Sequence, residues 1–149
     1  MIKIVRTNSN NTDFVYLVKQ LDSYLKIVDG DEHDFYNQYN NIDVLKHTVV
    51  AYLNNKPVGC GAFKKFDENS VEIKRMFTLP ETRSIGVASD ILKELEIWSK
   101  ENGYTSCVLE TGKKQIEAVN FYKKNNYKII PNFGQYANVD NSLCFKKQL

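Results

Sequence analysis

The order of apolar segments in this 149-residue chain predicts an α/β (α+β) protein with a mixed, mostly antiparallel sheet and helices on both faces. Three β-branched segments follow one another at 47–55, 58–66 and 71–79, and an Asn-Asn-Lys-Pro turn predicts that the first two form a hairpin. A segment of helical periodicity, 85–103, then separates the third strand from a fourth at 104–111. Because strand–helix–strand crossovers are right-handed and parallel, the sheet is expected to change strand direction there.

The other predicted elements flank this central unit. Residues 2–7 alternate as a first strand, and an N-cap at residues 11–13 precedes a helix whose apolar face extends to Leu25. The polar and aromatic stretch 28–43 predicts a loop with a short helix. The C-terminal part is predicted to contain a helix at 113–125 and strands at 127–131 and 141–147, with a loop between these strands. Because no repeat or linker interrupts the chain, we expect one domain over residues 1–149.

Composition argues against several classes of protein. A net charge of +2 without a basic stripe argues against a nucleic-acid partner. No apolar run approaches the roughly 20 residues that span a bilayer, and the N-terminus lacks a leader-like apolar stretch, so we expect no membrane partner and a cytoplasmic location. The three cysteines, Cys60, Cys107 and Cys144, form no CxxC pair and are predicted to be buried free thiols. No HExxH or paired CxxC motif is present, so no metal is expected.

The stretch Pro80 to Leu92, PETRSIGVASDIL, follows a strand and opens a helix. The first backbone N–H groups of a helix are unpaired and lie at the positive end of its dipole, so such a turn can hold a phosphate. Arg83 could pair with a phosphate oxygen, Ser84 could cap the helix, and Gly86 leaves room for a ligand. One glycine and one arginine are also compatible with an ordinary capped helix.

The surrounding motifs favour the phosphate-binding interpretation. The sequence RSIGVA fits the pattern Arg/Gln-x-x-Gly-x-Gly/Ala and resembles the coenzyme A loop of the GNAT acyltransferase superfamily. Downstream, LETGKKQIEAVNFYKKNNYKII looks like the second signature of that family, with Ala118 and Tyr122 four residues apart on one helix. EIKRMF and FGQYA…SLCFKK resemble a branch of small bacterial GNAT proteins. The resemblance covers residues 45–149 well and the first 45 residues in outline.

This resemblance implies a GNAT-like acyl-CoA N-acyltransferase fold, acetyl-CoA as co-substrate and N-acetyltransferase activity. It also implies that a backbone N–H near residues 76–78 polarises the thioester carbonyl. Departures from the family pattern are Ser84 for a frequent Gly, Gln115 for a frequent Asn, and Asn126 for a Gly after the last helix. The residues implied to bind the cofactor are Met76, Phe77 and Thr78 beside the pantetheine arm, Arg83, Ser84, Ile85, Gly86, Val87, Ala88 and Ser89 around the pyrophosphate, and Gln115.

Acetyl transfer to an amine requires a group that removes a proton and a group that protonates the leaving thiolate. Glu72 lies where histone-type members of the family place a general base, although it could instead be a structural partner of Lys74 on the same strand face. Glu110, at the end of the next strand, is the rival base or a residue that binds the substrate ammonium. Tyr122 matches the family tyrosine that protonates the thiolate, and its alternative is a core aromatic.

The acceptor pocket of the family corresponds here to residues 24–36 and 132–140. The first of these segments contains five consecutive or near-consecutive polar residues, Asp29, Asp31, Glu32, His33 and Asp34, which could attract a cationic amine or form a solvated loop. We expect a small-molecule amine as acceptor, with a protein N-terminus or lysine as the alternative. A CoA-binding regulatory module without catalysis also stays open, as do a monomer and a homodimer. Residues that could contact the acceptor are Tyr24, Lys74, Glu110 and Tyr136, with Arg75 as an alternative to Lys74.

Overall fold

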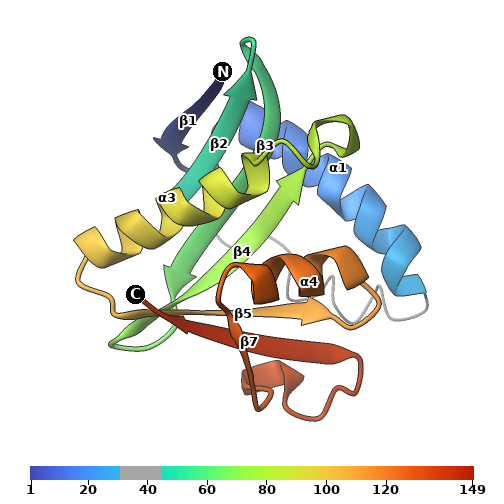
Figure 1. Ribbon diagram of the computed structural model, residues 1–149, viewed down its shortest axis with the longest axis vertical. Coiled ribbons are helices and arrows are strands. Elements are labelled where there is room, and N and C mark those ends of the chain that lie inside the picture. Colours follow the sequence, from blue (N-terminus) through green and yellow to red (C-terminus); the bar gives the residue numbers. More distant parts are fainter. Residues whose placement is uncertain (31–44) are drawn as a thin grey trace.

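The computed structural model describes residues 1–30 and 45–149, and Figure 1 shows their arrangement. Most of the predicted short helix and loop at 28–43 lies outside the described residues. No helix in the described ranges is both long and apolar enough to cross a membrane. The helices are α1 (Thr12–Asp29), α3 (Val87–Glu101) and α4 (Ile116–Lys124), with short 3-10 turns η2 (Pro80–Thr82) and η3 (Gly134–Tyr136). The strands are β1 (Ile2–Thr7), β2 (His47–Leu53), β3 (Lys56–Lys65), β4 (Ser70–Thr78), β5 (Ser106–Gly112), β6 (Lys128–Ile130) and β7 (Ser142–Gln148).

The described strands form one mixed sheet of seven strands in the order β1-β2-β3-β4-β5-β7-β6. Only β4 and β5 pair in parallel, and every other neighbouring pair in this sheet is antiparallel. The predicted mixed sheet, and its change of direction after β4, are therefore confirmed. Sequence order did not predict that β7 would insert between β5 and β6, which places the C-terminal strand directly beside β5.

Side chains of alternate strand residues pack against helices on opposite faces of the sheet, as predicted for helices on both faces. On one face, Val50, Cys60 and Ala62 pack with α1. On the other, Val49 and Ala51 belong to a larger core that includes α3 and Tyr122 of α4. Figure 1 shows α1 and α3 crossing the sheet on these two sides. Successive side chains of β2 therefore point to opposite faces of the sheet, and each face contributes to a separate part of the core.

Two glycines of β3 bring α3 close to the sheet. A Cβ on Gly59 would lie 2.8 Å from Ile91 Cδ1, and one on Gly61 would lie 2.9 Å from Ile91 Cγ2. Because Gly59 and Gly61 are two residues apart, both face the helix, and the missing side chains leave room for Ile91. The residue pattern of 58–66 predicted a strand but not this close approach of a helix. These glycines set the depth at which α3, and therefore its N-terminus, lies against β4.

Left-handed backbone positions agree with several of the turn predictions. Asn54 and Asn55 have φ of 52° and 67°, as a two-residue hairpin turn requires. Asn126, after α4, has φ of 73°, the left-handed conformation that was predicted for it. The side chain of Asn11 caps α1 by accepting a hydrogen bond from Phe14 N–H at 3.0 Å.

Two predicted helix faces are exposed at their first residues. Ile85 was assigned to the apolar face of the third helix, but α3 begins at Val87 and Ile85 is 52% exposed. Ile116, which was predicted to lie on one side of its helix with Val119 and Tyr122, is the first residue of α4 and is 67% exposed. For Ile85, helical periodicity was extended into the turn that precedes α3. Ile116 belongs to α4, but at the first position of the helix it lies largely outside the core.

We expect Gly61→Ala to lower the free energy of unfolding by about 1–3 kcal/mol, the usual cost of overpacking a tight core. The added Cβ would lie 2.6 Å from Met76 Sδ and 2.9 Å from Leu95 Cδ1, so the side chains of β4 and α3 would have to move. Urea unfolding followed by Trp98 fluorescence measures this change. A midpoint equal to that of the unsubstituted protein would show that α3 does not depend on the glycine contact.

Candidate functional site

The sheet opens where β4 and β5 separate. Their parallel pairing covers Ser70, Val71 and Glu72 of β4, and no later residue of β4 pairs with β5 in the described part of the chain. Figure 1 shows the two strands diverging from this point, with α4 lying beside the opening. The edge of β4 from Ile73 to Thr78 therefore faces a gap, and its backbone polar groups on that side need other partners.

Two hollows meet in this opening. The outer groove has a volume of about 810 Å³ and extends over the C-terminal end of β4 to the start of α3. The inner cavity has a volume of about 110 Å³ and lies between β4, β5 and the last turns of α1. A large ligand therefore fits only the outer groove, and only a small group fits the inner cavity. Five side chains line both, and they are Leu21, Met76, Gln115, Ala118 and Tyr122.

The N-terminus of α3 lines the outer groove with unpaired amides. Asp90 N–H donates the first intrahelical hydrogen bond, to Gly86 C=O at 3.0 Å, so the N–H groups of residues 86–89 have no partner within the helix. Gly86 is the N-cap residue with φ of 90°, and no side chain caps the helix. The suggestion that Ser84 caps α3 is therefore wrong. Ser84 has φ of 73°, which explains physically why a glycine suits this position.

Arg83 lies at the mouth of the outer groove and contacts three of its sides. Its Nη2 donates a hydrogen bond to Thr78 C=O at 3.2 Å, and its Nη1 lies 3.8 Å from a carboxylate oxygen of Glu117. The guanidinium carbon lies 5.7 Å from the ring centre of Tyr24. Tyr24, which was predicted to contact the acceptor, lines the outer groove.

A β-bulge in β4 interrupts the ladder at the wall between the two hollows. Cys60 pairs with Phe77 and Ala62 with Lys74, so Arg75 and Met76 together oppose the single residue between Cys60 and Ala62. Arg75 has φ of 59°, and its carbonyl accepts a hydrogen bond from the Cys60 thiol at 3.4 Å. Burial raises the pKa of Cys60 to about 12, so this group stays a thiol and not a nucleophilic thiolate. Because of the bulge, backbone polar groups of Arg75 and Met76 are not paired in the regular β3–β4 ladder. Met76 lines both hollows together with Tyr122.

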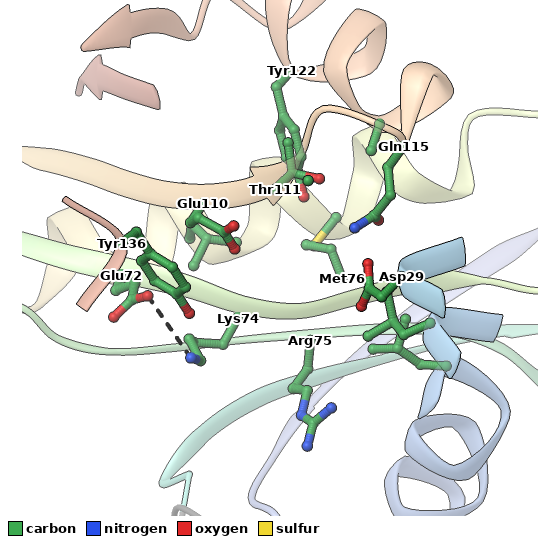
Figure 2. A pocket seen from close by; sticks show the side chains of 15 residues that line it. Asp29, Glu72, Lys74, Arg75, Met76, Glu110, Thr111, Gln115, Tyr122 and Tyr136 are labelled. Carbon is green, nitrogen blue, oxygen red and sulfur yellow. Dashed lines mark ion pairs between the residues drawn. The ribbon is translucent and has the colours of Figure 1, made fainter. Parts of the chain in front are cut away.

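The inner cavity contains buried charges that pair in two places. Lys74 Nζ lies 3.8 Å from Glu72 Oε2, and both side chains are at least nine-tenths buried. The same-face position of these residues, two apart on β4, was predicted. Arg75 Nη1 lies 2.8 Å from Asp22 Oδ1 of α1. Figure 2 shows the Glu72–Lys74 pair on one side of the cavity and the Arg75 guanidinium directed away from Tyr122.

Glu110 is the carboxyl with the most unusual surroundings. Its Oε2 is buried and has no hydrogen-bond partner among the described residues. Burial raises its pKa to about 7, and the neighbouring carboxylates of Asp29 and Glu72 add to this, whereas Ser142 and Lys74 act in the opposite direction. A carboxyl with these properties exchanges a proton near neutral pH. Sequence reasoning found the residue but could not foresee this environment.

Two tyrosine hydroxyl groups complete the inner cavity. Tyr122 is 7% exposed, and no hydrogen bond to its hydroxyl is present among the described residues. Burial, reinforced by the charge of Glu110, raises the pKa of Tyr122 well above its usual value, and burial likewise raises that of Tyr136. Both phenols therefore keep their protons at physiological pH. In Figure 2 Tyr122 extends from α4 toward the space between Glu110 and Gln115.

The structure brings together nearly all of the predicted site residues. The one that lines neither hollow is Ile85, which points into solvent. Asp29, which was placed in a loop, is the last residue of α1 and lines the inner cavity. Within residues 1–30 and 45–149, no group of three or more His, Cys, Asp or Glu side chains is arranged to hold a metal ion. The outer groove contains Tyr24, Met76, Phe77, Thr78, Arg83, Ser84, Gly86, Val87, Ala88, Ser89, Gln115 and Tyr122, and the inner cavity contains Glu72, Lys74, Glu110 and Tyr136.

The similar proteins described below are acetyltransferases or acyltransferases. The model of the acetyltransferase (GNAT) family matches residues 14–127. A protein named IAA acetyltransferase from Azospirillum brasilense is 28% identical over 153 aligned positions, which cover 99% of this chain and 98% of that protein. A solved structure of a proposed acyl-CoA N-acyltransferase from Klebsiella pneumoniae has a TM-score of 0.82 at 23% identity, covering 100% of this chain and 98% of that one.

A further solved structure carries the expected cofactor. It is a GNAT family acetyltransferase from Elizabethkingia anophelis with acetyl-CoA bound, and its TM-score is 0.72 at 18% identity, covering 99% of this chain and 98% of that one. At that identity the likeness concerns the fold. The family match extends over most of the chain, from α1 to the start of the C-terminal strands. The chain therefore belongs to the acetyltransferase (GNAT) family of enzymes.

Proposed function

We propose that this enzyme transfers the acetyl group of acetyl-CoA to the primary amine of a small molecule by direct attack. The observation that carries the proposal is the wall between the two hollows, where Tyr122, Met76 and Gln115 face both the amide-lined groove and the acidic cavity. A thioester in the groove and an amine in the cavity would meet at this wall. The small inner volume, about 110 Å³, supports a compact acceptor.

The outer groove is proposed to hold the cofactor along its length. The free N–H groups of residues 86–89 and the positive end of the α3 dipole would bind the pyrophosphate, with Arg83 beside it. The unpaired edge of β4, Met76 to Thr78, would hydrogen-bond the pantetheine arm like an added strand. Groups released by the bulge at Arg75 would then lie near the thioester carbonyl and stabilise its developing negative charge.

The inner cavity is proposed to manage the protons. The acceptor arrives as an ammonium ion and must lose a proton before its nitrogen can attack. Both Glu72 and Glu110 were candidates for this base. The unpartnered oxygen and near-neutral pKa of Glu110 support that residue, whereas Glu72 is held by Lys74. Glu72 is then proposed to hold Lys74 in position and, through its negative charge, to help keep the pKa of Glu110 raised.

Tyr122 is proposed to act on the leaving thiolate. Its hydroxyl has no competing hydrogen bond among the described residues, so it is available to a sulfur atom at the wall between the hollows. The raised pKa of Tyr122 means that its proton is always present for donation to the thiolate. The same shift makes complete proton transfer less favourable, so a strong hydrogen bond to the developing negative charge is the larger part of its proposed role.

The function is tested by thiol release from acetyl-CoA in the presence of a panel of primary amines. We expect amine-dependent release, and we expect Tyr122→Phe to lower kcat by about tenfold or more while changing the KM for acetyl-CoA by less than about threefold, because the lost hydroxyl acts only as the thiolate forms. Calorimetric titration of the same samples with acetyl-CoA measures binding separately. Binding without thiol release for any amine would favour a regulatory module, and an unchanged kcat in Tyr122→Phe would remove the role given to the hydroxyl.

Two left-handed glycines at opposite ends of α3 allow a matched test of the cofactor loop. Gly86 has φ of 90° and Gly103 has φ of 88°, and a Cβ on either would meet no atom within 4 Å. We therefore expect Gly86→Ala and Gly103→Ala to lose similar stability, about 1–2 kcal/mol. Only Gly86→Ala should also weaken acetyl-CoA binding, by about tenfold, because it disturbs the free amides. Equal affinities of the two variants in calorimetry would contradict the proposed pyrophosphate site.

The raised pKa of Glu110 predicts how stability depends on pH. Its pKa rises from 4.5 to about 7 on folding, so the native state binds this proton more tightly and stability falls as pH rises through this interval. A Glu110→Gln variant has no such titration, so it should be more stable than the unsubstituted protein at pH 8 by about 3 kcal/mol, with no difference below pH 4. The variant should also lose the acidic limb near pH 7 in the kcat/KM profile, together with about a hundredfold or more in rate.

Glu72→Gln provides the contrasting variant for this measurement. It removes the carboxylate that pairs with the buried Lys74 ammonium, and should therefore destabilise the protein at every pH at which the pair is formed. Denaturant unfolding of both variants between pH 4 and pH 8 separates the two cases. A Glu110→Gln variant that is less stable at pH 8 would show that the carboxylate of Glu110 is satisfied in the native state.

A further inference from the structure

We propose that Met76 sets the length of the acyl group that the enzyme accepts from coenzyme A, and that it restricts the donor to short acyl thioesters, acetyl above all. This inference rests on the proposed function, because it takes the thioester to lie at the wall between the two hollows. Of the five side chains that form this wall, three carry no nitrogen or oxygen atom: Leu21, Met76 and Ala118. An acyl chain that extends from the thioester would contact these three.

Neither hollow offers a longer acyl chain a suitable place. Glu72, Lys74 and Glu110 line the inner cavity, and an alkyl chain packed against these groups would displace water without replacing its hydrogen bonds. That cavity, with a volume of about 110 Å³, is also the space proposed for the acceptor amine. The outer groove is proposed to be filled by the pantetheine arm that leads to the thioester. Room for further methylene groups must therefore come from the wall itself.

Met76 is the side chain of the wall that occupies this room. Leu21 is 7% exposed and belongs to the core between α1 and the sheet, and Ala118 carries only a methyl group. Met76 is long, unbranched and partly buried against the core on the α3 side. Figure 2 shows it extending from β4 toward the hydroxyl end of Tyr122. Because a methionine side chain fills irregular gaps, its bulk at this point limits the length of the acyl group.

The sulfur of Met76 lies directly over a glycine of the neighbouring strand. The bulge places Arg75 and Met76 opposite Gly61, and a Cβ on Gly61 would lie only 2.6 Å from Met76 Sδ. The same Cβ would lie 2.9 Å from Ile91 Cγ2 and 2.9 Å from Leu95 Cδ1, and both of these side chains are fully buried. Met76 therefore fills the space above the glycine, and the packed core beneath leaves it no room to withdraw from the wall.

Two substitutions should change the acyl preference in opposite directions. Met76→Ala empties the space above Gly61, whereas Gly61→Ala fills it and pushes the thioether toward the groove. We expect the unsubstituted protein to bind butyryl-CoA about tenfold more weakly than acetyl-CoA, because additional methylene groups overpack the wall. Met76→Ala should bind butyryl-CoA at least as tightly as acetyl-CoA, since the added methylene groups occupy the vacated space. Gly61→Ala should weaken the binding of propionyl-CoA relative to acetyl-CoA by about fivefold.

Calorimetric titration with acetyl-, propionyl- and butyryl-CoA measures these ratios without an acceptor amine. Met76→Leu, which nearly conserves volume, should keep the ratio of butyryl-CoA to acetyl-CoA affinity within about threefold of the unsubstituted protein. Ile129→Ala shortens an apolar side chain that is 53% exposed and lines neither hollow, and it should leave the ratio unchanged. The same ratio in Met76→Ala as in the unsubstituted protein would overturn the role of Met76. A protein that binds no acetyl-CoA at all would instead overturn the proposed function.

A spectroscopic measurement tests the proposal on the unsubstituted protein, so it does not depend on the variants folding. The chain contains two methionines, Met1 and Met76, and Met1 is fully exposed. After labelling of the methionine methyl groups with ¹³C, the methyl signal of Met76 should differ in position among the complexes with coenzyme A, acetyl-CoA and propionyl-CoA. The signal of Met1 should be the same in all three. A Met76 signal that responds to coenzyme A but not to the acyl group would overturn the proposal.

Discussion

The functional architecture depends on the separation of β4 from β5 after three paired residues. Parallel pairing satisfies the backbone up to Glu72 and then ends, so the remaining edge of β4 needs other hydrogen-bond partners. The bulge at Arg75 strengthens this effect by interrupting the ladder on the opposite side as well. The gap accommodates the side chain of Tyr122, the start of α3 lies at its outer end, and the acidic cavity lies at its inner end. The proposed meeting of thioester and amine is a consequence of this opening.

Buried charge is the second constraint on the site. Glu72, Lys74, Arg75 and Glu110 all lie in a region where unpaired ions are costly, and three of them are neutralised by neighbours within the cavity or on α1. Glu110 is the exception, because one of its carboxylate oxygens has no donor among the described residues, and its raised pKa reflects the cost of burying the charged group. Proteins retain such locally unfavourable groups mainly where they are used. The stability of the fold and the proposed acid–base chemistry therefore compete at this one residue.

The sequence predicted the order of the elements, the change of strand direction and most of the residues around the two hollows. Those features depend on local patterns, such as the period of two in β2 or the tolerance of Asn126 for a left-handed turn. Features that depend on contacts between distant segments were missed. The bulge opposite Gly61, the insertion of β7 beside β5 and the position of Asp29 have no local signal. For the same reason the sequence named Glu72 and Glu110 as rival bases without the contacts that distinguish them.

The most direct test of this account is amide hydrogen exchange of the protein with and without acetyl-CoA. If the α3 terminus and the open edge of β4 hold the cofactor, the amides of residues 84–89 and 74–78 should exchange at least about tenfold more slowly in its presence. The amides of β1 and β2, on the far side of the sheet, should be unchanged. Saturating binding of acetyl-CoA without protection of either segment would contradict the account.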